Sequence, residues 1–345
     1  MIKREICEMK DFLDKVLKGN DLNQDEAYSA MEFIMNGNAN DCQIAAFLTA
    51  LNMKGETDAE ISGFSRAMLE KAIKVKSKHK NLVDTCGTGG DGLYTFNIST
   101  TAAFVAAGAG VPIAKHGNRS VSSRSGSADV LEELGVKIDL ECGEVSDCLD
   151  HVGIGFIFAP RAHTAMKYVA KARKDMGIRT VFNILGPITN PAQASGRVLG
   201  VFDENLIEVM INTLKNLGVE RAFVVNGEEG LDEFSVSGKN SVAELRDGRV
   251  TRYILDPEEL GFTKSKISDL AGGDKKENAK ILIDILTGKD KGAKMDSAVM
   301  NAAAAIVSGK KADCLKEGLE IARASIESGK AYEKLLKLIE FTNRK

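Results

Sequence analysis

The chain has 345 residues, which is enough for one large domain or two moderate ones. Its hydrophobic content of 43% and charged content of 28% are ordinary for a globular protein in water. A formal net charge of -3 gives no overall attraction to nucleic acid or to an anionic membrane, so an anionic ligand would need a local positive site.

The ends and the cysteines bear on where the protein works. The first residues lack the apolar core of a signal peptide, and no apolar run approaches the length of a membrane span. The cysteines are scattered and form no C-x-x-C pair, which favours free thiols over a disulfide scaffold or a zinc site. We therefore expect a cytoplasmic protein with no membrane partner. The six cysteines are Cys7, Cys42, Cys86, Cys142, Cys148 and Cys314.

The first 77 or so residues have helical patterns. Asn23 and Thr57 are each followed three residues later by a glutamate, which is the signature of a capping box. Apolar residues recur at helical spacing between positions 43 and 53, and Gly55 is placed to end that helix. Nothing catalytic is visible in this part, so we expect a scaffold or a dimer surface.

From residue 81 onward the pattern alternates between strands and helices. Alternation of this kind predicts an α/β fold with a mostly parallel sheet. We expect a small all-helical domain at residues 1–77, to which a helical excursion near 165–190 returns, and a larger α/β domain at 78–345 with helices flanking its central sheet. The expected strands lie at 82–83, 111–114, 154–159, 198–202 and 221–225, and the expected helices at 99–109, 128–134, 165–175, 204–217 and within 277–340.

The most informative stretch is residues 84–101, where four glycines fall within six positions, between an expected strand and an expected helix. Glycine tolerates positive φ and leaves the backbone N–H groups open to a ligand. A glycine loop before a helix N-terminus is a common phosphate site. The glycines are Gly87, Gly89, Gly90 and Gly92, and hydroxyls that add donors are those of Thr88, Thr95, Ser99 and Thr100.

Two well-known nucleotide motifs are excluded for this loop. Its glycines match G-x-G-x-x-G, but a dinucleotide site also needs an acid about 20 residues further on, and the chain has none there. A P-loop needs Lys followed by Ser or Thr after the last glycine, and that is absent too. A tight turn that uses glycine for packing alone remains the alternative.

A second candidate anion site spans residues 115–127, which contain three cations and five serines. Lys115, Arg119 and Arg124 supply charge, and Ser127 is a plausible N-cap for the next helix. Charge-assisted hydrogen bonds to phosphate contribute about 1.5–3 kcal/mol each. Two such loops after successive strands predict a ligand with more than one phosphate, and the alternative is a surface loop of solvated cations.

Adjacent acids Asp232 and Glu233 follow an expected strand and a glycine-containing turn. Beside two phosphate loops they are candidate Mg²⁺ ligands, because Mg²⁺ takes few protein carboxylates together with phosphate oxygens and water. Mere solvation of two exposed acids is the alternative, and residues 234–236 are a further strand candidate. His116 and His163 match no metal-ligand spacing, and a structural role is the commoner one for such histidines.

Together these segments closely resemble the anthranilate phosphoribosyltransferase family. The resemblance covers nearly the whole chain, and its glycine loop is shared in outline with pyrimidine nucleoside phosphorylases. The matching motifs are residues 87–91, 97–100, 115–119, 126–129, Arg173, 179–187, 190–191 and 231–233, with the helical opening at 43–48 and 54–57 and the late segments 272–273 and 301–303.

The resemblance implies transfer of the 5-phosphoribosyl group from phosphoribosyl pyrophosphate to the amine of anthranilate, releasing pyrophosphate, in tryptophan biosynthesis. It also implies a site at the hinge of two domains, a Mg²⁺ cofactor and a homodimer. Lys115 and Arg173 are implied as catalytic residues and Ser99, Asp232 and Glu233 as metal ligands. The implied acceptor-binding residues are Gly87, His116, Asn118, His163 and Arg173. The implied donor-binding residues are Gly87, Gly90, Asp91, Thr95, Asn97, Ser99, Thr100, Lys115, Asn118, Arg119, Ser123 and Ser127.

Two other functions stay open on the residues. A pyrimidine nucleoside phosphorylase of related fold would cleave uridine or thymidine with phosphate and would not use phosphoribosyl pyrophosphate. A non-catalytic relative would bind nucleotide or nucleic acid through the same loops. The net charge and an aromatic content of only 6% oppose nucleic acid, which favours basic grooves and stacking platforms.

Overall fold

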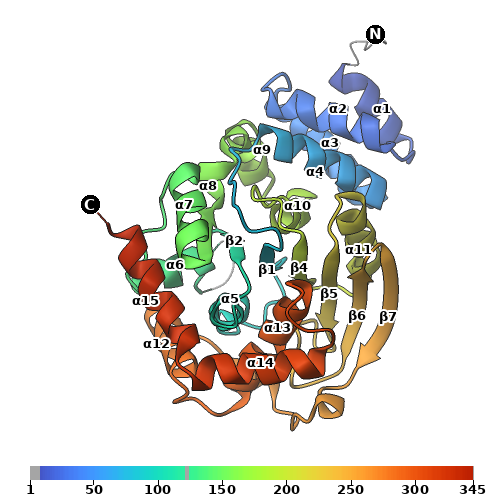
Figure 1. Cartoon of the computed structure of the whole chain (residues 1–345). Coiled ribbons are helices and arrows are strands. Elements are labelled where there is room, and N and C mark those ends of the chain that lie inside the picture. Colours follow the sequence, from blue (N-terminus) through green and yellow to red (C-terminus); the bar gives the residue numbers. More distant parts are fainter. Residues whose placement is uncertain (1–7, 121–123, 345) are drawn as a thin grey trace.

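The structure is a computed structural model that describes residues 8–120 and 124–344. A helical bundle lies at one end of the molecule, and a central sheet with helices on both faces forms the rest (Figure 1). The predicted combination of a small helical part with a larger α/β part is confirmed. None of the helices in the described residues is long and apolar enough to cross a membrane.

The bundle begins with four helices whose starts agree with the sequence signals. The side chains of Asn23 and Thr57 accept hydrogen bonds from N–H groups of the first turns of α2 and α4, and both capping boxes form. Gly55 ends α3 with a φ of +86°, a conformation that favours glycine. The helices are α1 (Met9–Leu17), α2 (Gln24–Met35), α3 (Asp41–Lys54) and α4 (Asp58–Lys71).

The described residues form a seven-stranded sheet in the order β3-β2-β1-β4-β5-β6-β7. Its first five strands are parallel, whereas β6 and β7 form an antiparallel hairpin at one edge. The strands are β1 (Val83–Gly87), β2 (Ile113–Gly117), β3 (Ile154–Phe158), β4 (Gly196–Gly200), β5 (Arg221–Gly227), β6 (Asn240–Arg246) and β7 (Arg249–Leu255).

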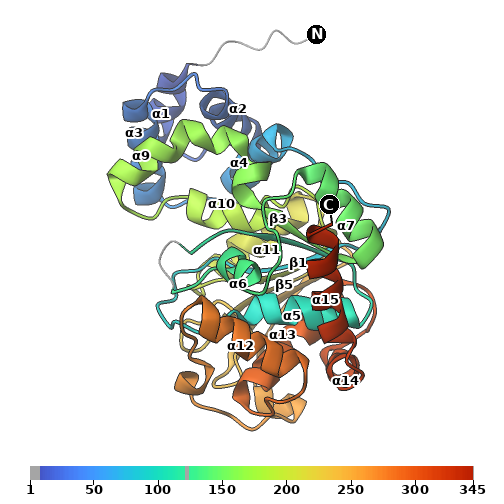
Figure 2. The ribbon, with the colours of Figure 1, turned by 90° about the vertical axis from the view of Figure 1, so that its left-hand side faces the viewer.

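The parallel strands are buried on both faces, which accounts for their nearly continuous apolar character, whereas β7 at the edge is largely exposed. Val198 and Phe223 belong to an apolar cluster with helices α5 (Ile98–Gly108) and α13 (Ala293–Ser308). Their neighbours Leu199 and Val224 point the other way, into a cluster with α11 (Leu206–Asn216) and the bundle. Figure 2 shows these layers edge-on, with the bundle beyond α10 and α11.

The connections between strands carry the remaining helices of the middle of the chain. Val169 and Ala172 of α9 are buried in the same apolar cluster as Phe47 of α3, so this segment packs against the bundle rather than the sheet. The helices are α6 (Ser127–Glu133), α7 (Cys142–Val152), α8 (Ala159–Ala162), α9 (Lys167–Met176) and α10 (Phe182–Ile188), with a 3-10 turn at Thr164–Met166.

The C-terminal part returns to helix, as predicted, and covers α5 on the face away from the bundle (Figure 2). Asn278, Asn301 and Ser325 are buried there and hydrogen-bonded. The elements are 3-10 turns Pro257–Leu260 and Ile267–Leu270, and helices α12 (Lys275–Leu286), α13, α14 (Leu315–Glu327) and α15 (Lys330–Thr342).

Two local predictions are wrong. Ser127 is the first residue of α6, and Gly126 occupies the N-cap position. Residues 234–236 do not form a strand. Their backbone groups bond to side chains instead, because the Phe234 N–H donates to Asn301 and the Ser235 N–H donates to Asn240.

Candidate functional site

The candidate site lies at the carboxyl ends of the parallel strands, where the strand order reverses. The chain passes from β1 to β2 on one side of it, while β4 pairs with its other side. Such a switch point opens a crevice in which α/β proteins bind ligands. The strands end there in Gly87, Gly117 and Gly200, and the two loops predicted from sequence begin at the first two of these glycines.

The glycine loop has the backbone that its sequence predicts. Gly89, Gly90 and Gly92 have φ values of +71°, +83° and +72°, which only glycine adopts readily. The Gly89 N–H donates to Asp232 Oδ2 at 2.6 Å, and the Thr88 N–H donates to the carbonyl of Gly200 at 3.0 Å. The loop is therefore hydrogen-bonded both to the end of β4 and to the segment that carries the acid pair.

The acid pair is buried, with Asp232 9% and Glu233 8% exposed. Glycine makes room for it, because a Cβ on Gly87 or on Gly200 would collide with Asp232. Asn301 of α13 fixes the following residue, since its amide accepts from the Phe234 N–H and donates to the Phe234 carbonyl, both at 3.0 Å. The predicted metal ligands are thus held from two sides rather than being solvated acids.

Like charges crowd this point. Burial, with the nearby charges of Glu233 and Asp91, holds the pKa of Asp232 well above its ordinary value. Burial raises the pKa of Glu233 to about 7, although Lys115 and hydrogen bonds from Ser99 oppose that rise. Two buried carboxyl groups therefore lie together, and a cation bound between them would balance their negative charge.

Lys115 lies beneath this acid pair rather than on the surface. It is 4% exposed, and its Nζ donates to the Thr85 carbonyl at 2.7 Å and to Ser99 Oγ at 3.4 Å. Ser99 in turn bonds Glu233 through its side chain and backbone. Lys115, Ser99 and Glu233 thus form a connected polar chain between β2, α5 and the acid segment.

These donors fit Mg²⁺. They are carboxylate and hydroxyl oxygens of Asp232, Glu233 and Ser99, the hard oxygen ligands that Mg²⁺ prefers. In residues 8–120 and 124–344, no group of three or more His, Cys, Asp or Glu side chains is arranged to hold a metal. The arrangement suits an ion that completes its coordination with water and ligand phosphate, as Mg²⁺ commonly does.

The second loop meets the first through Asn97. Its Nδ2 donates to the Ser125 carbonyl at 3.2 Å, and its Oδ1 accepts from Asn278 Nδ2 at 2.9 Å. Asn118 is exposed, and its carbonyl accepts from Ser127 Oγ at 3.4 Å. Ser123 lies outside the described residues.

Three predicted donor-binding residues are paired with other residues or buried in the structure. Arg119 forms hydrogen bonds with Asp129 at 3.0 Å and with Glu132 at 2.9 and 3.0 Å, all on α6. Thr95 forms an isolated bridge with Ala271, and Thr100 is only 1% exposed within α5. Asp91 and Gly90 lie in the glycine loop, where Asp91 accepts from the Leu93 N–H at 3.1 Å.

On the bundle side, His116 and His163 form a buried pair with ring centroids 5.1 Å apart. Nε2 of His163 lies 3.0 Å from the Thr189 carbonyl and so carries the proton, while Nε2 of His116 is buried and has no hydrogen-bond partner among residues 8–120 and 124–344. Burial lowers the pKa of His163 to about 4, and burial with the nearby charges of His163 and Arg197 lowers that of His116. Both rings are therefore neutral at pH 7.

Arg173 lies on α9, with its guanidinium 5.2 Å from the centre of the Phe182 ring. Burial lowers its pKa, and in the described residues no ion pair involves it. A half-buried guanidinium without an acidic partner is suited to a carboxylate ligand, because its donors match the two carboxylate oxygens. Arg173 thus stands on the bundle side of the site, on a different element from the acid pair.

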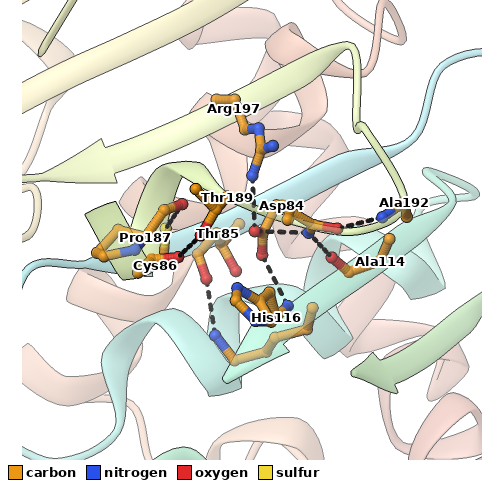
Figure 3. Close-up of polar contacts among 12 residues, drawn as sticks. Asp84, Thr85, Cys86, Ala114, His116, Pro187, Thr189, Ala192 and Arg197 are labelled. Atoms are coloured by element: carbon orange, nitrogen blue, oxygen red, sulfur yellow. Dashed lines mark hydrogen bonds and ion pairs between the residues drawn. The ribbon is translucent and has the colours of Figure 1, made fainter. Parts of the chain in front are cut away.

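Figure 3 shows a separate polar network in the middle of the sheet. Asp84 of β1 is fully buried, and its Oδ2 accepts from Arg197 Nη1 at 2.8 Å and from Asn190 Nδ2 at 2.7 Å. Its Oδ1 accepts from the His116 N–H at 3.1 Å. This network supports the strand from which the glycine loop starts.

Three residues that contact the site were not predicted as site residues. Asn301 fixes the acid segment, Asn278 orients Asn97, and Arg179 donates to the carbonyl of Gly90 at 2.5 Å. Asn301 and Arg179 fall in stretches that carry the family resemblance, and that was their only signal. Asn278 gave none, because it lies 181 positions from its partner.

Comparisons with known proteins agree with this geometry. Residues 79–332 match the family described as "Glycosyl transferase family, a/b domain", and residues 10–72 match "Glycosyl transferase family, helical bundle domain". A relative from Pelotomaculum thermopropionicum, an anthranilate phosphoribosyltransferase, is 57% identical over 334 residues, 97% of this chain and 96% of its own.

Solved structures give the same result. The anthranilate phosphoribosyltransferase of Thermus thermophilus is 42% identical, with a TM-score of 0.92 over 97% of this chain and 100% of its own. The Saccharomyces cerevisiae enzyme in complex with PRPP and Mg is 30% identical, with a TM-score of 0.88 over 97% of both chains. The fold and site thus define a glycosyltransferase with a helical bundle domain. The chain belongs to the anthranilate phosphoribosyltransferase family.

Proposed function

We propose that the protein transfers the 5-phosphoribosyl group of phosphoribosyl pyrophosphate to the amine of anthranilate, as family membership implies. The observation that carries this proposal is the contact of the glycine loop with the acid pair. Gly89 N–H and Asp232 Oδ2 are 2.6 Å apart, and Lys115 and Ser99 lie beside Glu233. The groups that would donate to phosphate and the groups that would bind the metal are therefore in direct contact, as a polyphosphate bound together with Mg²⁺ requires.

The donor would bind across the two loops at the carboxyl edge of the sheet. The donor-binding residues in this proposal are Gly87, Gly90, Asp91, Thr95, Asn97, Ser99, Thr100, Lys115, Asn118, Arg119, Ser123 and Ser127. Arg119 would have to exchange Asp129 and Glu132 for phosphate, which makes it the weakest member of the set. Thr100 would act through the packing of α5, since its side chain is buried.

We propose that Asp232, Glu233 and Ser99 hold Mg²⁺. The chemistry that a bound Mg²⁺ supplies is neutralisation of the charge that collects on the departing pyrophosphate. Lys115 places a second positive charge next to the same point, from inside the sheet. This choice is supported by two structures of the Saccharomyces cerevisiae enzyme that contain Mg.

The acceptor would bind on the bundle side. Arg173 would pair with the carboxylate of anthranilate, and neutral His116 and His163 would form the wall with Gly87 and Asn118. An aromatic amine is uncharged at pH 7 and has a free lone pair, so the reaction needs no strong base. The residues act mainly by holding the amine close to the ribose carbon that it attacks.

The two-part architecture is a further part of the proposal. Residues 1–77 would form one domain, to which 165–190 return, and 78–345 would form the donor-binding domain. We also propose a homodimer, supported by apolar side chains exposed on the bundle, such as Met53 at 85% and Leu17 at 64%. A cytoplasmic location is supported by the free thiols of the described cysteines.

The test is an assay that mixes protein, Mg²⁺, phosphoribosyl pyrophosphate and anthranilate and follows the loss of anthranilate fluorescence. Continuous loss that requires all four components supports the proposal. No loss, together with release of uracil from uridine in the presence of phosphate, would replace it with a nucleoside phosphorylase activity.

A further inference from the structure

Arg179 joins three parts of the molecule at one point between α9 and α10. Its Nη2 donates to the Gly90 carbonyl at 2.5 Å, and its guanidinium lies 4.5 Å from the centre of the Phe202 ring, just beyond β4. Its own carbonyl accepts from Nδ2 of Asn52, on α3 of the bundle, at 3.2 Å. One residue therefore touches the glycine loop, the sheet edge and the bundle.

The contact with Gly90 is specific to glycine. Gly90 has a φ of +83°, and a Cβ at this position would collide with the guanidinium of Arg179. In residues 8–120 and 124–344 no ion pair involves Arg179. Its charge is thus directed at a backbone carbonyl and an aromatic face, both weak partners that a stronger ligand or a movement of the segment would displace.

The neighbouring peptide is held from the opposite side. The N–H of Gly89 donates to Asp232 Oδ2, whereas the carbonyl of Gly90 accepts from Arg179. The two glycines in positive φ are therefore clamped between the candidate metal ligand and the α9–α10 connection. The same connection follows α9, which carries Arg173.

From this geometry we propose that Arg179 is a positioning residue that couples the acceptor segment to the donor loop. The inference rests on the proposed function. When the acceptor is bound by Arg173, α9 and the α9–α10 connection become more ordered. Through its bond to the Gly90 carbonyl, Arg179 then holds the Gly89–Gly90 peptides in the conformation that binds the donor. Such a link is a coupling free energy between two sites, so each substrate tightens the binding of the other.

A purely structural role makes a different prediction. Arg323, on α14, offers a control, because its guanidinium also lies over a phenylalanine, 5.4 Å from the centre of the Phe262 ring. It differs from Arg179 in an additional ion pair with Asp296 at 4.0 Å. Both arginine-to-alanine changes remove one cation–π contact. Only Arg179→Ala also frees the glycine loop.

The experiment measures initial rates over a grid of phosphoribosyl pyrophosphate and anthranilate concentrations for wild type, Arg179→Ala, Arg179→Lys and Arg323→Ala. For Arg179→Ala we expect the KM of the donor to rise about tenfold and the dependence of each KM on the other substrate to be lost. Arg179→Lys keeps a donor for the Gly90 carbonyl and should retain part of the coupling. Because Arg179 is exposed, added methylguanidinium should partly restore the alanine variant.

The outcomes separate the two proposals. Unchanged donor KM and coupling in Arg179→Ala, or equal losses in Arg179→Ala and Arg323→Ala, would overturn the role of Arg179 alone. A lower melting temperature of Arg179→Ala without any change in the KM values would also overturn it. A wild-type protein without transferase activity would instead overturn the proposed function.

Discussion

Buried acids occur at two places near the carboxyl ends of the strands, and their charges have different surroundings. Asp84, inside the sheet, accepts from Arg197, Asn190 and the His116 N–H, so its charge is matched. Asp232 and Glu233, at the edge, are almost as buried but lie beside each other and Asp91, with Lys115 as the nearby cation.

The difference distinguishes an acid whose charge is matched within the chain from a pair of acids whose charges are not. Burying a charge without a partner is expensive, so a fold keeps such a group only where something else compensates it. For Asp84 the compensation is built into the chain. For the acid pair, which Gly87, Gly200 and Asn301 hold in place, we propose that the compensation comes from a bound cation. The comparison predicts that the first group governs stability and the second governs activity.

The largest effect is expected on stability, when the cation that pairs with Asp84 is removed. Arg197→Met should lower the free energy of unfolding by about 3–5 kcal/mol, because Asp84 remains buried without a cation. Arg66→Met is the matched control. Its ion pair with Asp25 is exposed, with side chains 40% and 89% accessible, and its guanidinium lies 4.4 Å from the centre of the Tyr28 ring. Losing these two exposed contacts should cost only about 1 kcal/mol. Urea denaturation measures both, and equal costs for the two variants would remove the contrast.

The next largest effect is expected from neutralising the acid pair. Asp232→Asn combined with Glu233→Gln should lower kcat/KM about a hundredfold or more, the scale of one lost preorganised stabiliser. Its stability should stay near that of wild type or rise, since two buried like charges are removed. Glu258→Gln, at an exposed side chain, serves as the control. Near-normal turnover in the double variant would contradict the proposal that Asp232 and Glu233 bind the metal.

His163 is a third buried titratable group, and among the described residues no acid pairs with it, so its ring stays neutral. The folded pKa of His163 is about 4 against an ordinary 6.5, so the unfolded chain binds more protons between these values. The contribution of His163 is complete above pH 6.5 and is lost as pH falls toward 4. At pH 5 this loss is about 2 kcal/mol.

His163→Gln removes that titration, so its stability should fall less than that of wild type between pH 7.5 and pH 5. His116 faces the same ring and leaves part of the acid sensitivity in place. His151→Gln, at an exposed ring, is the control. Denaturation curves at the two pH values give the comparison, and identical slopes with pH for wild type and His163→Gln would contradict a neutral buried ring.

The smallest of these effects concerns Arg173. Arg173→Ala should raise the KM of anthranilate about tenfold, because it removes the carboxylate partner, and should change the KM of the donor far less. Arg161→Ala is a suitable control, since its guanidinium is exposed and paired with Glu141 at 3.0 Å. A rise in the donor KM alone would show that Arg173 serves the other substrate.

The sequence predicted the elements well where local chemistry decides them. Asn23 and Thr57 cap helices because their side chains reach N–H groups only two or three residues away. The glycine loop was recognised because positive φ favours one residue type. Residues 234–236 resembled a strand, but buried amides of Asn301 and Asn240 take their backbone groups. No local pattern reveals a partner 67 positions away.

The site was predicted in its residue types but not in its connections. Lys115 was expected to supply charge in a phosphate-binding loop, and in the structure it is buried at the end of β2 and bonded to Thr85 and Ser99. Arg119 was expected to be free for phosphate and is paired with acids of α6. Gly87 was expected to admit a ligand, and in the structure the space beside its Cα holds Asp232. Each of these depends on long-range packing, which residue spacing does not encode.

We propose that Mg²⁺ balances the charge of the acid pair when the donor binds. Isothermal titration calorimetry of phosphoribosyl pyrophosphate, with and without Mg²⁺, tests it most directly in wild type and in the Asp232→Asn, Glu233→Gln double variant. Wild type should bind the donor at least about tenfold more tightly with Mg²⁺, while the double variant should gain little from the ion. An equal gain from Mg²⁺ in both proteins would contradict the claim.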